Sequence, residues 1–372
     1  MTVPRSPHRA WIEVDHDALR NNLKAIRAAA PGSDVIAVVK ANAYGHGDVA
    51  VARTLVAEGV ERLAVATVDE AVGLRHAGID RPTLVLWAVG PAEAATVVEL
   101  GLEPVVYDSR GIDILESAAG GRRVGVHLKV DTGLGRQGAA PEDAVAIAGR
   151  IAASPVLELA GTMSHLAVPG EDDAYTEVQL VRLARALDAM RSAGLDPGLV
   201  HVGATGSLFA GIGEVPAVRP GLALYGMQPA WAVDEIGLRP VLSLKALPLR
   251  VFDLGAGEAI GYGLRFRTAG PTRIATLGIG YGDGWPRAHA NNGSVLVRGH
   301  RAPIVGAISM DGLTVDVGGV PGVTYGDEFV LIGEQEGARI SAEEVADERR
   351  TINYEVTTAL RDRLPRLHLG AS

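Results

Sequence analysis

The residue with the clearest chemical potential is Lys40, which directly follows the apolar run VIAVV. A lysine at the end of a buried strand has a partly desolvated ammonium, and this favours the neutral amine, a nucleophile that can form a Schiff base with a carbonyl compound. The alternative is a lysine whose stem packs along the strand while its charge reaches water. The position alone leaves both interpretations open.

Polar side chains also follow other apolar runs. Lys129 and Asp131, with Arg136 nearby, follow VGVHLKV, while His165 ends LAGTMSH and Arg219 lies in VRPGLALYG. Several such residues at strand ends are harder to explain by packing than one, so we expect them to converge on one site. Taken singly, the histidine equally fits a hydrogen-bonded core residue, and the arginine of the turn DTGLGRQG equally fits a solvated side chain.

Two glycine-containing loops, GATGS and RPGL, follow the seventh and eighth apolar runs. Barrel enzymes often bind phosphate in these two loops. Backbone amides near Gly221 and the hydroxyl of Thr205 could hold a phosphate dianion. Ordinary turn formation explains the same glycines equally well.

The elements that must position these residues alternate between apolar runs and amphipathic segments. Such segments include residues 141–153 and 175–193, whose apolar residues recur at helical spacing. The apolar runs occupy residues 35–40, 62–67, 83–88, 103–107, 124–130, 159–165, 199–203 and 218–226. This alternation predicts an α/β fold in which residues 1–240 form a (β/α)8 TIM-type barrel.

The pattern changes after residue 240. Short apolar runs follow one another between Gly- and Pro-rich turns, with almost no helical periodicity. One helix is expected at residues 341–350, where Ser341 and Glu344 have the spacing of a capping box. Residues 241–372 are therefore predicted to form a mainly-β C-terminal domain.

Composition excludes several classes of protein. The 372 residues carry a net charge of −9, which leaves no basic excess for binding nucleic acid, and the absence of cysteine excludes disulfides and thiolate nucleophiles. The first residues lack the apolar core of a secretion signal. The longest apolar stretch, around PTLVLWAVG, is far shorter than the roughly 18 residues that span a bilayer. We expect a cytoplasmic enzyme with no membrane partner.

Six segments in this chain resemble the ordered signature segments of the alanine racemase family. They are VVKANAYGHG, DTGLGRQG, VRPGLALYG, GYGDGWPR, ISMD and TINYEV. The similarity runs from about residue 11 to residue 368. It implies a barrel followed by a β domain, pyridoxal 5'-phosphate as cofactor, a homodimer with shared active sites, and interconversion of L- and D-alanine.

The resemblance also implies roles for individual residues. Lys40 would bind the cofactor and act as the base on the D-face, and Tyr281 of the partner subunit would be the base on the L-face. Arg219 would face the pyridine nitrogen, with His201 supporting it and His165 packing near the cofactor ring.

Further residues would hold the substrate and the phosphate. Arg136 would contact the cofactor phenolate and the substrate carboxylate. The backbone of Met310 would also contact that carboxylate, and Asp311 would line the substrate pocket. Lys129 matches a lysine that some family members carry as a carbamate. The phosphate would contact Tyr44, Thr205, Gly221 and Tyr354. At the position of Thr205 the family commonly has serine, so this chain keeps the hydroxyl group.

These residue types suit racemisation because it needs two acid/base groups on opposite faces of the substrate. A guanidinium has no acceptor capacity, so the pyridine nitrogen opposite Arg219 should stay unprotonated. A serine or broad-specificity racemase remains the alternative. A related decarboxylase would need an acidic residue opposite that nitrogen and a catalytic cysteine, whereas this chain has Arg219 and no cysteine. A non-catalytic carrier built on the barrel alone would not need the β domain with its GYGDGW and ISMD segments.

Overall fold

The computed structural model describes residues 9–212, 215–233 and 236–371. Contacts divide the chain into two compact units. One unit contains Arg20–Ala43 and Asp48–Leu238. The other unit contains the C-terminal part of the chain from Arg239, together with the N-terminal residues up to Leu19 and the short segment Tyr44–Gly47. The sequence pattern predicts that these last two stretches belong to the barrel, and the structure groups them with the other unit instead.

The first unit is a closed barrel of eight parallel strands, as predicted. Each strand pairs with the next along the chain, and the last pairs with the first. The strands are β2 (Asp34–Val38), β3 (Arg62–Val65), β4 (Thr83–Ala88), β5 (Glu103–Val106), β6 (Val124–Lys129), β7 (Leu157–Met163), β8 (Leu199–Ala204) and β9 (Ala217–Arg219). Most of their apolar residues are buried, as expected for a sheet covered on both faces, and Trp87 at the end of β4 is an exception with 45% of its surface exposed.

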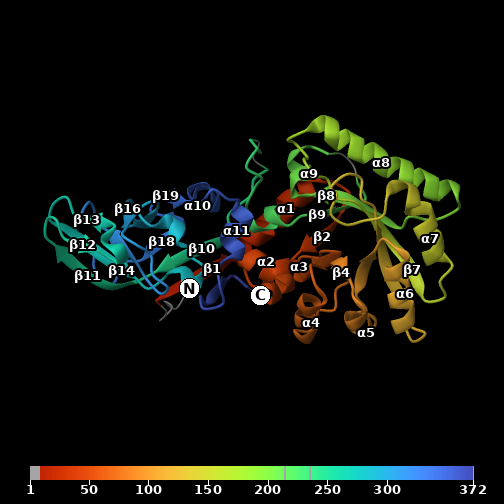
Figure 1. Ribbon diagram of the computed structural model, residues 1–372, viewed down its shortest axis with the longest axis horizontal. Helices are drawn as coiled ribbons and strands as arrows, with labels where there is room; N and C mark the ends of the chain where they lie inside the picture. The colour runs from red at the N-terminus through yellow and green to blue at the C-terminus, as the bar shows by residue number, and fades with distance from the viewer. Residues whose placement is uncertain (1–8, 213–214, 234–235, 372) are drawn as a thin grey trace. The chain divides into compact units, whose positions relative to one another are not determined.

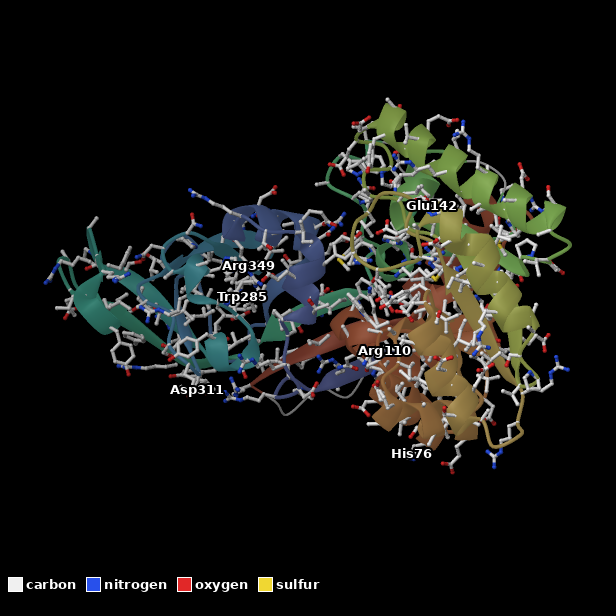
Figure 2. The ribbon with its side chains drawn as sticks, turned by 45° about the vertical axis from the view of Figure 1, so that its right-hand side comes forward. His76, Arg110, Glu142, Trp285, Asp311 and Arg349 are labelled. Atoms are coloured by element: carbon white, nitrogen blue, oxygen red, sulfur yellow. The ribbon has the colours of Figure 1, made fainter. Side chains whose placement is uncertain are left out.

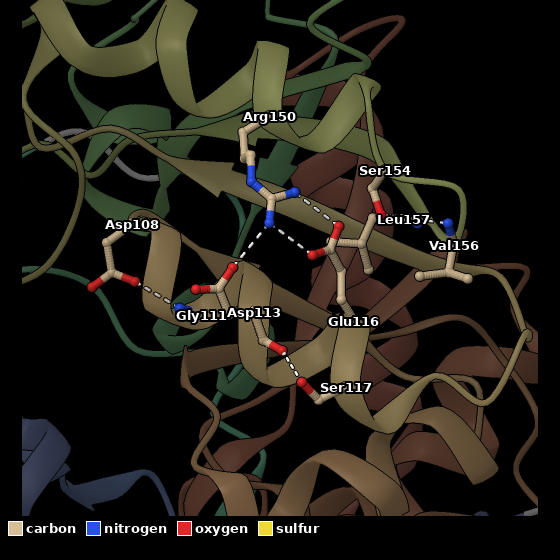
Figure 3. Close-up of polar contacts among 9 residues, drawn as sticks. All are labelled: Asp108, Gly111, Asp113, Glu116, Ser117, Arg150, Ser154, Val156 and Leu157. Atoms are coloured by element: carbon tan, nitrogen blue, oxygen red, sulfur yellow. Dashed lines mark hydrogen bonds and ion pairs between the residues drawn. The ribbon is translucent and has the colours of Figure 1, made fainter.

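Helices connect the barrel strands, and Figure 1 shows α4 to α7 flanking them. The helices are α1 (His16–Ala29), α2 (Lys40–Gly45), α3 (Asp48–Ala57), α4 (Val68–His76), α5 (Pro91–Glu99), α6 (Ser109–Ala118), α7 (Ala144–Ala152), α8 (Asp173–Ser192) and α9 (Thr205–Phe209). In Figure 3, Arg150 of α7 donates to Asp113 and Glu116 of α6, which links two neighbouring helices at the surface. No described helix is both long enough and apolar enough to cross a membrane.

The eighth apolar run differs from the prediction. Only Ala217–Arg219 is a strand, and Leu222–Tyr225 forms a 3₁₀ turn. Pro220 has no N–H group to donate to a ladder, so the strand ends there. The Tyr225 hydroxyl then donates to the carbonyl of Val38 at 2.8 Å, which ties this turn to β2.

The second unit is mainly β, as predicted. Its main sheet has the order β11-β14-β17-β16-β15-β18-β10-β1-β20, with β19 paired to β18 and a separate β12–β13 hairpin. The strands are β1 (Ala10–Asp15), β10 (Leu242–Ala246), β11 (Pro248–Leu254), β12 (Ala259–Ile260), β13 (Phe266–Arg267), β14 (Thr272–Leu277), β15 (Ser294–Val297), β16 (His300–Val305), β17 (Leu313–Asp316), β18 (Phe329–Gln335), β19 (Ala338–Ile340) and β20 (Arg366–Leu369).

Two features of this unit were not apparent in the sequence. Strand β1, from the beginning of the chain, pairs with β10 and with β20 from its end. A second helix, α11 (Asn353–Thr358), follows the expected helix α10 (Ala342–Arg349). The Ser341 hydroxyl accepts from the Glu344 amide as a capping box requires, but the Glu344 carboxylate pairs with Arg301 instead of closing the box.

Candidate active site

Lys40 begins α2, with one residue between it and the end of β2, at the carboxyl end of the barrel strands. Burial lowers the pKa of its ammonium, and the positive charge of Arg136 lowers it further, while the Glu70 carboxylate acts in the opposite direction. The neutral amine is therefore more accessible here than on a free lysine. This direction of the pKa favours the first of the two interpretations that the strand-end position left open.

The chain after Lys40 forms one left-handed helical turn. The four residues from Ala41 to Tyr44 have φ between 51° and 55°, although none of them is glycine. A left-handed helical conformation costs roughly 1–2 kcal/mol for each such residue. Two hydrogen bonds help to hold the turn: the Ala41 amide donates to Glu70 at 2.7 Å, and Asn42 accepts from the Asp48 amide at 3.0 Å.

Arg219, at the end of β9, is only 4% exposed and is surrounded by acceptors. Its guanidinium donates to the Nδ1 atom of His201 at 2.8 Å and to the carbonyls of His201 and Ser164 at 2.6 and 2.7 Å. His165 Nδ1 lies 3.3 Å away. Burial lowers the pKa of Arg219 to about 9, so the guanidinium stays charged at neutral pH.

The two histidines beside Arg219 are neutral at physiological pH. Burial, followed by the Arg219 charge, lowers the pKa of His165 to about 3 and that of His201 well below its ordinary value. Neither side chain can serve as a cationic acid near pH 7. Their place against the guanidinium is that of neutral acceptors and packing groups.

Lys129 ends β6 and is 5% exposed. Burial lowers its pKa to about 8, with further contributions from the positive charges of Arg136 and Arg219, and the Asp131 carboxylate opposes the shift. The barrel therefore concentrates Lys40, Lys129, Arg136 and Arg219 within electrostatic reach of one another. Such an excess of positive charge favours an anionic ligand.

The loop that carries Arg136 is organised by Asp131. The Asp131 carboxylate accepts from the amides of Gly133 and Leu134, each at 2.9 Å. Burial by itself would raise the pKa of this carboxyl group, but these backbone hydrogen bonds lower it. The Tyr175 hydroxyl donates to the Gly133 carbonyl at 2.7 Å, which anchors the loop to α8.

Two residues that the sequence analysis missed connect this loop to β4. Gln137 donates to the Leu86 carbonyl at 3.0 Å, and the Arg136 guanidinium lies 5.6 Å from the centre of the Trp87 ring. The pairing of β4 with β5 is irregular between Val85 and Ala88, so a bulge directs the tryptophan outward. Its position at a strand end was the available signal.

The expected phosphate residues occur as one pair in each unit. In the barrel, the buried Thr205 hydroxyl accepts from the amides of Gly221 and Ala223 at 3.3 and 3.2 Å. In the other unit, the Tyr44 and Tyr354 rings lie 6.0 Å apart, and burial raises the pKa of both phenols. The barrel pair thus combines one hydroxyl with backbone amides, and the other pair brings two phenol rings close to each other.

Tyr281 lies on a tight turn of the β unit, with 37% of its surface exposed. The fully buried Asp283 carboxylate accepts from the Gly280 amide at 3.0 Å and from Arg9 at 2.6 Å, which fixes the turn. A Cβ atom on Gly280 would overlap the carbonyl of Ser309, so only glycine allows the two segments to approach. The tyrosine ring is thus displayed on a rigid base.

The ISMD segment lies against this turn. The Met310 carbonyl accepts from the Gly282 amide at 2.8 Å, and Asp311 accepts from Arg363 at 2.7 Å. The same arginine lies 3.5 Å from Asp283, so it connects both segments. The sequence analysis did not single out Asp283 or Arg363, because neither role is visible before the segments meet.

The tryptophan of the GYGDGWPR segment anchors the turn from the other side. Trp285 is 1% exposed and stacks on His289 with ring centres 4.5 Å apart. Figure 2 shows Arg349 beside Trp285, and its guanidinium lies 5.0 Å from that ring. Within the described part of the chain, no group of three or more His, Asp or Glu side chains is arranged to hold a metal ion.

Comparison with known proteins agrees with this architecture along nearly the whole chain. Residues 14–229 match the family model "Alanine racemase, N-terminal domain", and residues 241–368 match "Alanine racemase, C-terminal domain". The alanine racemases of Syntrophobacter fumaroxidans and Symbiobacterium thermophilum are each 40% identical, over 97% of this chain and 98% and 97% of theirs.

Solved structures give the same result. The alanine racemase from D-cycloserine-producing Streptomyces lavendulae has a TM-score of 0.92 at 35% identity and covers 98% of both chains. That from Bacillus anthracis, with bound L-Ala-P, has a TM-score of 0.91 at 34% identity and covers 99% of this chain and 96% of its own. The fold is thus that of isomerases that act on amino acids. The chain belongs to the alanine racemase family.

Proposed function

We propose that this enzyme interconverts L-alanine and D-alanine with bound pyridoxal 5'-phosphate. The observation that carries the proposal is Lys40, a strand-end lysine whose neutral amine is favoured by burial and by neighbouring cations. A serine or broad-specificity racemase is the second candidate, because the residues assigned to the substrate would contact the α-carbon substituents that all amino acids share.

The residues present fit this cofactor. The barrel offers an amine for covalent attachment, a concentration of cations for an anionic ligand, and the Thr205 hydroxyl beside the amides of Gly221 and Ala223. We assign the phosphate to Thr205 and Gly221, together with the phenols of Tyr44 and Tyr354. When bound, pyridoxal phosphate would supply an electron sink that acidifies the α-proton of the substrate.

Arg219 would restrict the reaction to racemisation. Its guanidinium can only donate hydrogen bonds, and at a pKa of about 9 it stays charged at neutral pH. We assign it to the pyridine nitrogen, which it would keep unprotonated. His201 accepts from it at 2.8 Å and would hold it in place, with His165 packed beside it.

Proton transfer would use two groups, one on each face of the substrate. Lys40 would remove or return the α-proton on the D-face, and Tyr281 would do so on the L-face. We assign Arg136, Asp311 and the backbone of Met310 to the substrate and its carboxylate.

We further propose a homodimer in which Tyr281 of the partner subunit serves Lys40. The exposed ring on a rigid turn suits a residue that acts on another copy of the chain.

Lys129, whose pKa is lowered to about 8, would react in its neutral form with CO2 to give a carbamate beside Arg136. The physiological role would be the supply of D-alanine for peptidoglycan in the cytoplasm.

The substrate is tested by incubating the purified protein with a panel of L-amino acids and separating the products on a chiral column. Conversion of alanine well above that of serine and of larger amino acids is expected. Comparable rates across the panel would favour the broad-specificity alternative, and no conversion of any member would reject the racemase.

Lys40 is tested separately by reducing the yellow protein with borohydride and mapping the modified peptide. The modification should lie on Lys40. Lys129 is the internal control, because it is the other buried lysine near the site, and modification there instead would overturn the assignment.

A further inference from the structure

The buried guanidinium of Arg219 has no ion pair with any carboxylate in the described part of the chain. Its contacts are backbone carbonyls and neutral imidazoles. Removing a charge from water without a partner of opposite sign is costly. The structure must therefore compensate this charge in a less direct way.

A chain of side-chain hydrogen bonds leads from Arg219 to a carboxylate. His201 Nε2 lies 2.8 Å from His127 Nδ1, and His127 Nε2 lies 3.2 Å from Glu103 Oε2. Arg62 donates to the same oxygen at 3.2 Å. The chain thus crosses the barrel interior from the carboxyl end of β9 to the first residue of β5.

The direction of each hydrogen bond follows from the two ends. Arg219 can only donate, so His201 Nδ1 accepts and His201 Nε2 must carry the proton. His127 Nδ1 then accepts from His201, so His127 Nε2 carries a proton and donates to the Glu103 carboxylate. Every donor meets an acceptor, and both imidazoles are polarised in the same direction between the cation and the anion.

The barrel backbone is adapted to this chain. Both imidazoles are completely buried. A Cβ atom on Gly161 of β7 would overlap His127 Nδ1, so glycine leaves the room for that ring. Strand pairing is irregular at His127 in β6 and at His201 in β8, where bulges redirect side chains.

The far end of the chain is an ionised carboxylate. Burial would raise the pKa of Glu103, but the hydrogen bond from His127 and the charge of Arg62 bring it below its ordinary value. Its side chain is 17% exposed, in contrast to the fully buried histidines. Glu103 therefore carries a negative charge at neutral pH, at the amino end of the barrel.

We propose that Glu103 is the counter-charge of Arg219 and that His127 transmits its effect through His201. Glu103 and His127 are then positioning residues, which hold the guanidinium without touching the substrate. This inference rests on the function proposed above for Arg219.

The test is nitrogen-15 NMR of the histidine rings in the full-length protein as purified, comparing wild type with Glu103→Gln. Glu103→Gln replaces the hydrogen bond from His127 Nε2 to an ionised group by a hydrogen bond to a neutral one. If His127 transmits this loss, the Nε2 proton of His201 should exchange with solvent about tenfold faster, because its own acceptor His127 is then less polarised. Glu158→Gln is the matched control, since it removes an exposed carboxylate from β7, and it should match wild type.

A double-mutant comparison separates transmission from general loosening. His127→Phe interrupts the chain, so adding Glu103→Gln in that background should not change His201 exchange further. If the His127→Phe variant does not fold, His127→Asn serves as the background variant in the same comparison. An equal effect of Glu103→Gln in both backgrounds, or no effect in either, would overturn the proposal.

Activity provides a readout of its own. Glu103→Gln should lower kcat for alanine about tenfold, as expected for one weakened charge-assisted hydrogen bond, with little change in KM. Unchanged kcat would contradict a role for Glu103 in catalysis. If Glu103→Gln changes His201 exchange only when His127 is present, but the wild-type protein racemises no amino acid, the proposed function is rejected while the hydrogen-bond link from Glu103 to Arg219 is retained.

Discussion

At the scale of single residues, the site depends on cations that are held close together in a buried place. Lys129 shows the effect most clearly, because burial and its cationic neighbours lower its pKa from 10.5 to about 8. Such a shift is also a statement about stability, since the folded and unfolded chains then bind protons differently.

The stability of wild type relative to Lys129→Met should therefore rise with pH. Below pH 8 the lysine is charged in both states, and the folded state bears the whole cost of the buried charge. Between pH 8 and 10.5 the folded state releases the proton first, so the cost is relieved, by up to about 3 kcal/mol. Urea unfolding of both proteins in CO2-free buffer at several pH values measures this. If the difference in unfolding free energy between wild type and Lys129→Met does not depend on pH, the lowered pKa of Lys129 is contradicted.

Tyr281→Phe should remove one of the two acid/base groups. Racemisation should fall about 10²- to 10⁴-fold in both directions, because either direction needs one group to take a proton and the other to return it. Lys40 would still exchange the α-proton of D-alanine, so deuterium from solvent should enter D-alanine with retention while L-alanine stays largely unlabelled.

Mass spectrometry after chiral separation follows this exchange. Tyr325→Phe is the control, since it makes the same change at another exposed tyrosine of the same unit. Equal loss of exchange from both enantiomers would argue against one base for each face.

At the scale of elements, the turn after Lys40 is under conformational strain. Ala41 is exposed and has a φ of 53°, in the region that glycine enters without steric cost. Two hydrogen bonds oppose this strain: Glu70 accepts from the Ala41 amide, and the Asn42 side chain accepts from the Asp48 amide beyond the turn. Strain of this kind is often found at functional sites.

Ala41→Gly should leave the free energy of unfolding unchanged or raise it by up to about 1 kcal/mol, because relief of strain offsets the greater freedom of glycine in the unfolded chain. The same substitution at Ala184, an exposed position inside α8, should destabilise by about 1 kcal/mol. Urea unfolding of the two variants compares them directly. Equal destabilisation by both would show that the left-handed turn costs nothing.

At the scale of the whole molecule, the proposed dimer makes a prediction that neither unit makes alone. If Tyr281 serves the partner subunit's lysine, a heterodimer of Lys40→Ala and Tyr281→Phe chains has one site with both groups and one site with neither. Mixing the two inactive variants should then restore about half of the wild-type activity per heterodimer.

The mixed sample must be shown to contain heterodimer, for example by differential tagging and tandem purification. Each variant mixed with itself is the control and should stay inactive. Absence of recovery in verified heterodimer would mean that both groups act within one chain.

Much of this architecture is determined by sequence patterns that act locally. The pattern of apolar residues distinguishes the barrel from the β unit. A barrel strand is mostly apolar because helices cover its outer face and the barrel interior covers the other, and amphipathic helical segments separate such strands, whereas the β unit lacks that helical periodicity. Lys40 could be identified as a candidate because it ends such a run, and six ordered segments identify the family.

The tertiary structure decided the features that depend on contacts between distant residues. Strand β1 completes a sheet more than 200 residues away, since its register partners include Ala246, and no local pattern specifies that partner. The left-handed turn after Lys40 depends on Glu70, and Asp283 gains its role only when Arg9 reaches it. His127 looks in the sequence like one more residue of an apolar strand. It becomes a link to Arg219 only because barrel closure brings β6 and β8 together, where buried polar groups must find partners.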